Sequence, residues 1–230
     1  MTDSKRPNRI PFIAIVIAVV AIVGSLVVRN FFPVEHLSHG QQTRTFTIDM
    51  DFDRFRQILV RKNGTESIIN YSGMKLLNQR LEDIAIDVSQ DKRPVINAIL
   101  GKSKAIVAAA KTLTVEMNDP SLGASTMHLR QVAEIEPSKI DIVTSSTEPA
   151  GKLEKYTSTL HAEPMGQFTQ VTIGVDMTVR VIVPKLFTRR ADSRVQDAAD
   201  KAVVNQADSM GKFFAEHANK TLILPELGVR

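Results

Sequence analysis

Residues 171–183 read VTIGVDMTVRVIV, with an apolar side chain at every odd position. Successive side chains of a β-strand point to opposite faces, so this alternation predicts one long strand with a single buried face. Pro184 follows directly. Because proline cannot donate a hydrogen bond to a neighbouring strand, we expect the strand to end there.

A pattern with helical spacing comes after the proline. Asp192 and Ser193 can each cap a helix, and beyond them one face repeats at steps of three and four residues. The residues of this face are Val195, Ala199, Ala202, Val203, Gln206, Met210, Phe213, Phe214 and His217. An apolar helix face needs a partner, and the odd-numbered face of 171–183 is the nearest candidate. We therefore expect the two elements to pack together.

Shorter alternations of apolar and polar residues come before the long strand. They predict strands over 45–52, 84–88, 113–117, 127–133, 140–142 and 156–162, joined by turns rich in Pro, Gly, Asn and Asp. Asp53 can cap a short helix that ends at Gly64, residues 65–81 indicate short helices, and a helix-like run covers 95–110 with a break at Gly101. The pattern predicts an α+β domain.

The order of these elements resembles the START-like superfamily, also called SRPBCC, which has the helix-grip fold. The closest likeness runs from Phe168 to His217, where a valine-rich strand, a proline and an amphipathic helix containing Gly-Lys-Phe-Phe (211–214) follow one another. It extends over about 43–219 and includes the strand and helix of 45–59. A predicted N-terminal anchor and a longer helical insertion depart from the family pattern. The resemblance implies a curved antiparallel sheet closed by the long C-terminal helix.

In that superfamily the sheet and the closing helix enclose an apolar cavity for lipids, sterols, polyketides or other hydrophobic molecules. The likeness and the alternation of side chains together imply which residues line such a cavity here. They are Met117, Leu129, Gln131, Tyr156, Ser158 and Met177 on the strands, opposite Met210 and Phe213 on the helix. Three of them are polar on otherwise apolar faces, so each either contacts a ligand or is satisfied by backbone or water.

The sequence contains no recognisable catalytic motif. It lacks GxSxG, a paired-carboxylate spacing and a phosphate-binding glycine loop, and it has no cysteine. His36 and His39 lie beside Glu35, but without the spacing of a metal motif such as HExxH. We therefore expect no metal and no cofactor. A non-enzymatic domain is favoured, and a cyclase or hydrolase built on the same cavity stays open.

A membrane anchor is predicted before the domain. Residues 10–28 carry no charge and are rich in Ile, Val and Ala. As a helix they would span about 28 Å, close to the thickness of a bilayer core. A cleaved signal peptide is the alternative, although its apolar region is usually shorter. Lys5, Arg6 and Arg9 precede the segment, which favours a cytoplasmic N-terminus and an extracytoplasmic domain of a single-pass protein in the cell membrane.

The predicted organisation has five parts. They are a cytoplasmic tail (1–9), a transmembrane helix (10–28), a polar linker (29–44), the START-like α+β domain (45–219) and a C-terminal tail (220–230).

The net charge of +4 belongs mainly to the residues that flank the predicted anchor, Lys5, Arg6, Arg9 and Arg29. The rest of the chain is close to neutral, and with no Trp and two Tyr it offers few stacking platforms. These properties exclude a typical nucleic-acid-binding domain.

One local basic cluster lies where the long strand meets the last helix. Its members are Lys185, Arg189, Arg190 and Arg194. The cluster either meets anionic lipid headgroups or is a solvated junction diluted by Asp192 and Asp197.

These features predict a membrane-tethered, non-enzymatic domain whose partners are the lipid bilayer and a hydrophobic small molecule or lipid. The alternative is a structural subunit of an envelope complex, like secretion-system scaffolds with a nuclear-transport-factor-like domain. That fold puts its long helices before the sheet. Here the longest predicted helix comes last, which favours the binding domain. Protein partners are left open.

Overall fold

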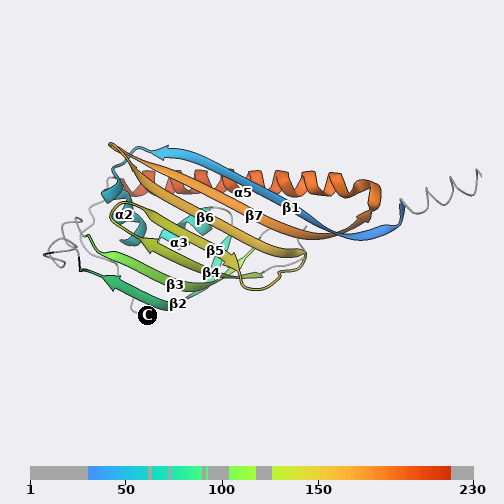
Figure 1. Cartoon of the computed structure of the whole chain (residues 1–230), viewed down its shortest axis with the longest axis horizontal. Helices are drawn as coiled ribbons and strands as arrows, with labels where there is room; N and C mark the ends of the chain where they lie inside the picture. The colour runs from blue at the N-terminus through green and yellow to red at the C-terminus, as the bar shows by residue number, and fades with distance from the viewer. Residues whose placement is uncertain are drawn as a thin grey trace, which may run out of the picture.

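Strand β7 (Phe168–Pro184) organises the structure because it pairs along its length with β1 (Pro33–Ile48) on one side and with β6 (Leu153–Met165) on the other. The computed structural model describes residues 31–61, 64–71, 74–89, 92, 104–117 and 126–218. Within these ranges, one antiparallel sheet has the strand order β1-β7-β6-β5-β4-β3-β2 (Figure 1).

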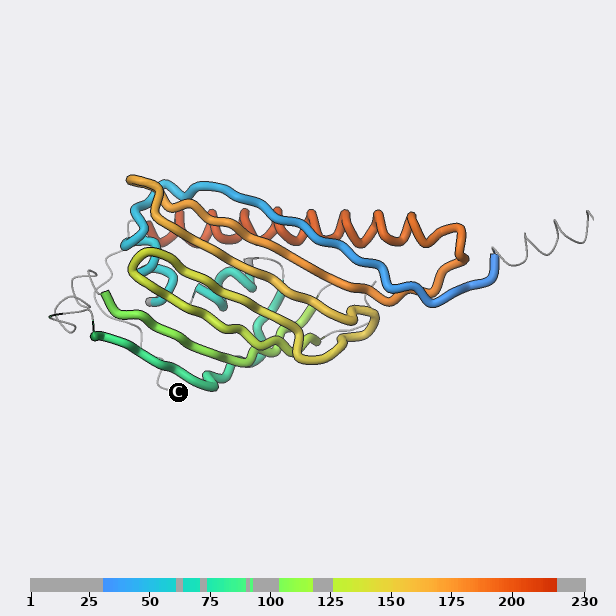
Figure 2. The backbone as a smooth tube through the Cα atoms, in the orientation of Figure 1, coloured from blue at the N-terminus to red at the C-terminus, as the bar shows by residue number. Residues whose placement is uncertain are grey.

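The remaining elements complete this sheet and cover one of its faces. The other strands are β2 (Lys75–Asp87), β3 (Ile106–Glu116), β4 (Thr126–Ile135) and β5 (Ile140–Ser146). The helices are α2 (Phe52–Arg61), α3 (Gly64–Tyr71), the short 3-10 helix η2 (Lys185–Phe187) and α5 (Thr188–His217). Helix α5 runs along β1 and β7, as the tube in Figure 2 shows.

The predicted packing of the long strand against the last helix is confirmed. Odd-numbered residues of β7 from Val171 to Val179 are buried, while Val181 and Val183 are half-buried. They belong to two clusters, both shared with α5. In the first, which we call the α2 cluster, Val171 and Ile173 pack with Phe213 and its neighbours. In the second, which we call the β3–β4 cluster, residues 175–179 of β7 pack with residues 195–203 of α5, Leu113 and Leu129.

The curved antiparallel sheet and the long C-terminal helix therefore agree with the predicted α+β class. The predicted transmembrane helix (10–28), the tail 1–9 and the tail 220–230 lie outside the described residues. Among the helices that the structure does describe, none combines the length and the hydropathy needed to cross a membrane.

The prediction of a linker over 29–44 is wrong from Pro33 onward, since these residues form most of β1. Its polar side chains do not prevent strand formation, because β1 pairs with β7 along its whole length and bonds to the β7 backbone at alternate residues. Helix α5 covers β1 at Ser38 and Gly40, which are buried. Small residues allow this close approach, so hydrophobic alternation is not needed there.

Three further boundaries differ from the prediction. Residues 65–81 are divided between α3 and the first half of β2, and residues 106–110 belong to β3. The alanine-rich segment 108–110 has high helix propensity, but pairing with β2 and β4 on both sides overrides it. Helix α5 begins at Thr188, before the predicted caps. Residues 95–103 of the helix-like run predicted over 95–110 lie outside the described residues.

We expect Gly40→Ala to destabilise the fold by about 1–3 kcal/mol, because an added methyl group would overpack the contact between β1 and α5. A Cβ atom at Gly40 would lie 2.5 Å from the carbonyl oxygen of Val195, which belongs to the helix backbone. Urea denaturation of the full chain measures the change.

Gly211→Ala is the matched control for Gly40→Ala, because a Cβ at this position of α5 would have no described atom within 4 Å outside its own turns of the helix. Alanine is a better helix former than glycine, so a gain of roughly 0.5–1 kcal/mol is expected. Equal effects of the two substitutions would contradict the close approach of β1 and α5.

Candidate ligand-binding pocket

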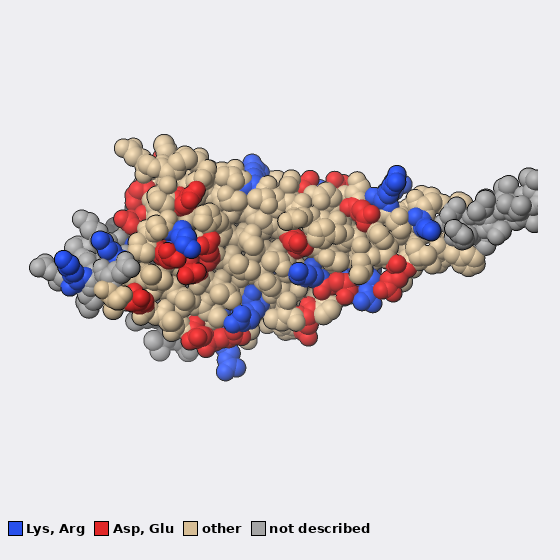
Figure 3. Space-filling view, in the orientation of Figure 1, with Lys and Arg blue, Asp and Glu red and all other residues tan. Residues whose placement is uncertain are grey.

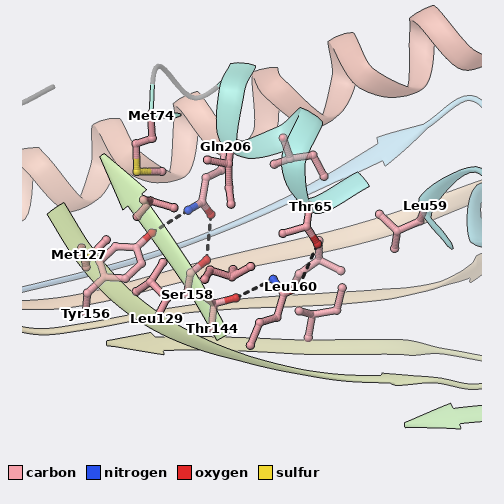
Figure 4. Close-up of a pocket in the computed structure, with 16 residues that line it drawn as sticks. Leu59, Thr65, Met74, Met127, Leu129, Thr144, Tyr156, Ser158, Leu160 and Gln206 are labelled. Carbon is pink, nitrogen blue, oxygen red and sulfur yellow. Dashed lines mark hydrogen bonds between the residues drawn. The ribbon is translucent and has the colours of Figure 1, made fainter. Parts of the chain in front are cut away.

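A mainly apolar pocket of about 100 Å³ lies between the inner face of the sheet and helices α3 and α5 (Figure 4). The inner face is the one that packs against α5. The lining residues are Leu59, Thr65, Ile68, Ile69, Met74, Leu113, Val115, Met127, Leu129, Gln131, Ile142, Thr144, Tyr156, Ser158, Leu160 and Gln206. Strands β3 to β6 therefore form the floor, and α3 with Gln206 of α5 forms the roof.

Four of the predicted cavity residues line this pocket. They are Leu129 and Gln131 on β4, and Tyr156 and Ser158 on β6. Alternate positions of one strand share a face, which is why each pair points into the same space.

The other four predicted residues lie elsewhere. Met177 is buried in the β3–β4 cluster and Met117 packs at its edge. Met210 and Phe213 are fully buried in the α2 cluster, beside Phe55. These two face the sheet as predicted, but α2 fills the space in front of them. Their surroundings are closed core and not part of the pocket.

Polar groups from two elements meet at one end of the pocket. Gln206 Nε2 donates a hydrogen bond to the Tyr156 hydroxyl at 2.8 Å, and the Ser158 hydroxyl donates to Gln206 Oε1 at 3.0 Å (Figure 4). Burial is the main cause that raises the pKa of Tyr156, so the phenol stays protonated at neutral pH. This group of three satisfies its own polar atoms inside an apolar wall.

A second polar chain crosses the pocket floor. Lys111 Nζ donates to the Thr65 hydroxyl at 2.8 Å, and that hydroxyl donates to Gln131 Oε1 at 3.0 Å. Gln131 Nε2 in turn donates to the Thr144 hydroxyl at 3.0 Å. Desolvation by burial lowers the pKa of Lys111 from 10.5 to about 8.

Strand pairing explains why these polar residues meet. Lys111 pairs with Gln131, Gln131 with Thr144, and Thr144 with Ser158. The four residues thus form one row across β3, β4, β5 and β6, which we call the polar row. Cross-strand neighbours on one face lie about 4.5–5.5 Å apart at Cβ, so the row is continuous.

The sequence-based reasoning did not identify Thr65, Thr144 or Gln206 as pocket residues, nor Lys111 as their neighbour beside the pocket. For two of them, Lys111 and Gln206, the sequence pattern does indicate a position on a buried face. Lys111 occupies an odd position in line with the buried Leu113 and Val115, and Gln206 interrupts the apolar stripe of α5. The sequence pattern gives no such indication for Thr65 and Thr144, because their positions depend on the placement of α3 and β5.

The described residues contain no group of three His, Asp or Glu side chains that could hold a metal ion. Charged pairs lie mostly on the outer surface, for example His161 Nδ1 and Asp141 Oδ1 at 2.7 Å. On the face in Figure 3, basic and acidic side chains are interspersed. Nucleic-acid recognition gains no support from this face.

No protein-family model matches the sequence, and no curated protein is significantly similar to it. The fold is similar to that of the Zhui aromatase/cyclase from Streptomyces sp. R1128, at 12% identity and a TM-score of 0.49, over 80% of this chain and 97% of that chain. A START superfamily protein from Mycobacterium smegmatis matches at 12% identity and a TM-score of 0.47, over 78% and 99%. Ara h 8.0201 matches at 12% identity and a TM-score of 0.42, over 77% and 99%. The likeness concerns the fold alone. The antiparallel sheet closed by a long C-terminal helix, as predicted from the sequence, is confirmed by the strand order and by α5.

Proposed function

We propose that this helix-grip chain is a membrane-tethered, non-enzymatic protein that binds a hydrophobic small molecule between its sheet and its helices. The observation that carries the proposal is the apolar pocket with a few convergent polar groups, which is typical of ligand sites. Its mechanism is passive burial of apolar surface, worth about 25 cal/mol per Å².

The size of the pocket restricts the ligand. At about 100 Å³ it is smaller than common drug-sized sites of roughly 300–1,000 Å³. It is comparable to engineered apolar cavities of about 150 Å³, which bind benzene. A molecule with one ring, or one short acyl segment, fits the space as it stands, and a two-ring molecule requires a small displacement of the roof. A longer ligand requires displacement of α3, a helix of only eight residues that forms part of the roof.

The end of the domain next to the predicted anchor supports the tethering. Phe31 and Phe32 are exposed there, and β1 begins opposite Pro184, where η2 and α5 follow. Exposed apolar side chains of β7 and η2 accompany them at this end, namely Ile182, Leu186 and Phe187. The basic cluster of residues 185–194 occurs at the same end and complements anionic lipid headgroups.

A groove of about 380 Å³ opens at this same end. Its lining combines apolar residues such as Val181, Val183 and Phe187 with Arg190 and Arg194. Such a mixture suits the interface between headgroups and acyl chains, where aromatic and basic side chains are both favourable. The groove therefore agrees with a domain that stands directly on the bilayer.

A second candidate function, that of a structural subunit, is favoured by one observation. Strand β2 forms an edge of the sheet and exposes several large apolar side chains, namely Leu77, Leu81, Ile84 and Ile86. Exposed apolar edges often mark protein interfaces. Crosslinking that trapped the chain in a large hetero-oligomer without ligand would favour this alternative.

We expect Ser158→Phe to weaken ligand binding strongly, because the new ring would occupy the pocket. The probe is 2-naphthalenemethanol, whose fluorescence is excited selectively in a protein without tryptophan. The full chain in lipid nanodiscs is titrated, with empty nanodiscs subtracted. Affinity should fall by about tenfold or more, which corresponds to 1.4 kcal/mol.

The matched control is Thr159→Phe, which places the same ring on the exposed outer face of β6 and should leave the affinity unchanged. Native mass spectrometry of the purified chain adds an independent test for a copurified ligand. No uptake of the probe and no copurified molecule would contradict the proposed function, as would equal binding by both variants.

A further inference from the structure

Lys111 lies on the inner face of the sheet, which is otherwise mainly apolar. It shares the odd-numbered face of β3 with Leu113 and Val115, both of which line the pocket. On the neighbouring strand it pairs with Gln131, which also lines the pocket. The half-buried side chain of Lys111 reaches α3, where Thr65 accepts its hydrogen bond.

The ammonium group of Lys111 has one hydrogen-bond partner among the described residues. It has three N–H donors, and one of them binds Thr65 Oγ1 at 2.8 Å. Within the described ranges, no carboxylate lies at salt-bridge distance from Lys111 Nζ. Even partial burial of a cation without an anion is costly, and proteins usually pair such groups. The lowered pKa of Lys111 reflects the same burial without a compensating charge.

The two polar groups of the pocket differ in what they leave for a ligand. The group of Tyr156, Ser158 and Gln206 satisfies itself through two internal hydrogen bonds. The other group is the hydrogen-bonded series Lys111–Thr65–Gln131–Thr144. Its first member, Lys111, is a cation with further N–H donors, and it lies one hydrogen bond away from the pocket-lining Thr65. A single negative charge on a ligand at this end would therefore meet the one cation that lies beside the pocket.

We propose that the ligand is a hydrophobic carboxylic acid, with its apolar body in the pocket and its carboxylate bound by Lys111 beside Thr65. This inference rests on the proposed function and specifies its ligand class. A carboxylate carries one negative charge, which one ammonium group balances. A phosphate monoester carries about −1.5 to −2 and would remain undercompensated at a site with one cation.

The test compares 2-naphthoate with 2-naphthalenemethanol, which have the same ring system and differ in charge at neutral pH. Both are titrated into the full chain in nanodiscs by naphthyl fluorescence. We expect wild-type protein to prefer the acid by about 10- to 100-fold, the usual strength of a charge-assisted hydrogen bond in a shielded site. In Lys111→Met this preference should disappear through weaker binding of the acid, while the alcohol binds as before.

Two variants control for charge and position. Lys111→Arg keeps the positive charge and should retain most of the preference for the acid. Lys155→Met removes an exposed lysine from the outer face of β6 and should leave both affinities unchanged.

The outcomes separate the two proposals. Binding of the alcohol without any preference for the acid in wild-type protein would overturn the carboxylate inference and leave the proposed function intact. Equal losses of acid and alcohol in Lys111→Met would also overturn the inference. Failure of both probes to bind wild-type protein would overturn the proposed function together with the inference.

Discussion

Replacement of Phe213 by alanine is expected to lower the free energy of unfolding by about 3–5 kcal/mol, the usual cost of removing a fully buried phenylalanine. Phe213 is 0% exposed and packs edge-on against Phe214, with ring centroids 5.0 Å apart. Phe214 in turn stacks on Phe55 of α2 at 4.2 Å. The cavity left by the substitution would be held open by α2, α5 and the sheet, so little relaxation is expected.

Urea denaturation of the full chain measures this loss. Val204→Ala is the control, because Val204 lies on the same helix but is exposed, and its truncation should change stability by roughly 0.5 kcal/mol or less. At temperatures where Phe213→Ala stays folded, the affinity for 2-naphthalenemethanol should be unchanged, since Phe213 does not line the pocket. Lost binding with normal stability would instead place Phe213 in the ligand site.

Lys111→Met is expected to stabilise the ligand-free chain by about 2–3 kcal/mol at neutral pH. The pKa of Lys111 is about 8 in the folded state against an ordinary value of 10.5. One pKa unit corresponds to 1.36 kcal/mol, so the partial burial of this charge costs up to roughly 3 kcal/mol below pH 8, and the lost hydrogen bond to Thr65 offsets part of the gain. A substitution that stabilises the chain and weakens acid binding is the usual mark of a functional residue kept at a cost in stability.

The pH dependence of stability distinguishes this effect from improved packing. Between pH 8 and 10.5 the unfolded chain binds the Lys111 proton and the folded chain has released it, so wild-type stability should rise with pH across this window. The gain from Lys111→Met should therefore shrink from pH 7 toward pH 10. Denaturation at several pH values, with Lys155→Met as the control, measures it. A gain that stays constant with pH would contradict a buried charge at Lys111.

The elements that could be predicted from sequence are those whose signal is local. In β7, every second residue is apolar because one face packs on α5 and the other does not. In α5, the stripe from Val195 to Phe214 repeats at helical spacing for the same reason. Periodicity reports which face of an element is buried, so the pairing of these two elements could be inferred before any coordinates.

Hydrophobic periodicity does not predict which element packs against a buried face, or whether a pocket lies there. Met210 and Gln206 share one stripe of α5, yet α2 packs over the first and the second reaches the pocket. In the same way, strand registers align Lys111 with Gln131 and Thr144, and the placement of α3 brings Thr65 above them. The sequence alone determined a sheet closed by a long helix. Only the tertiary structure decided where that closure leaves a space and which polar groups meet there, because both depend on register and on packing between elements distant in the chain.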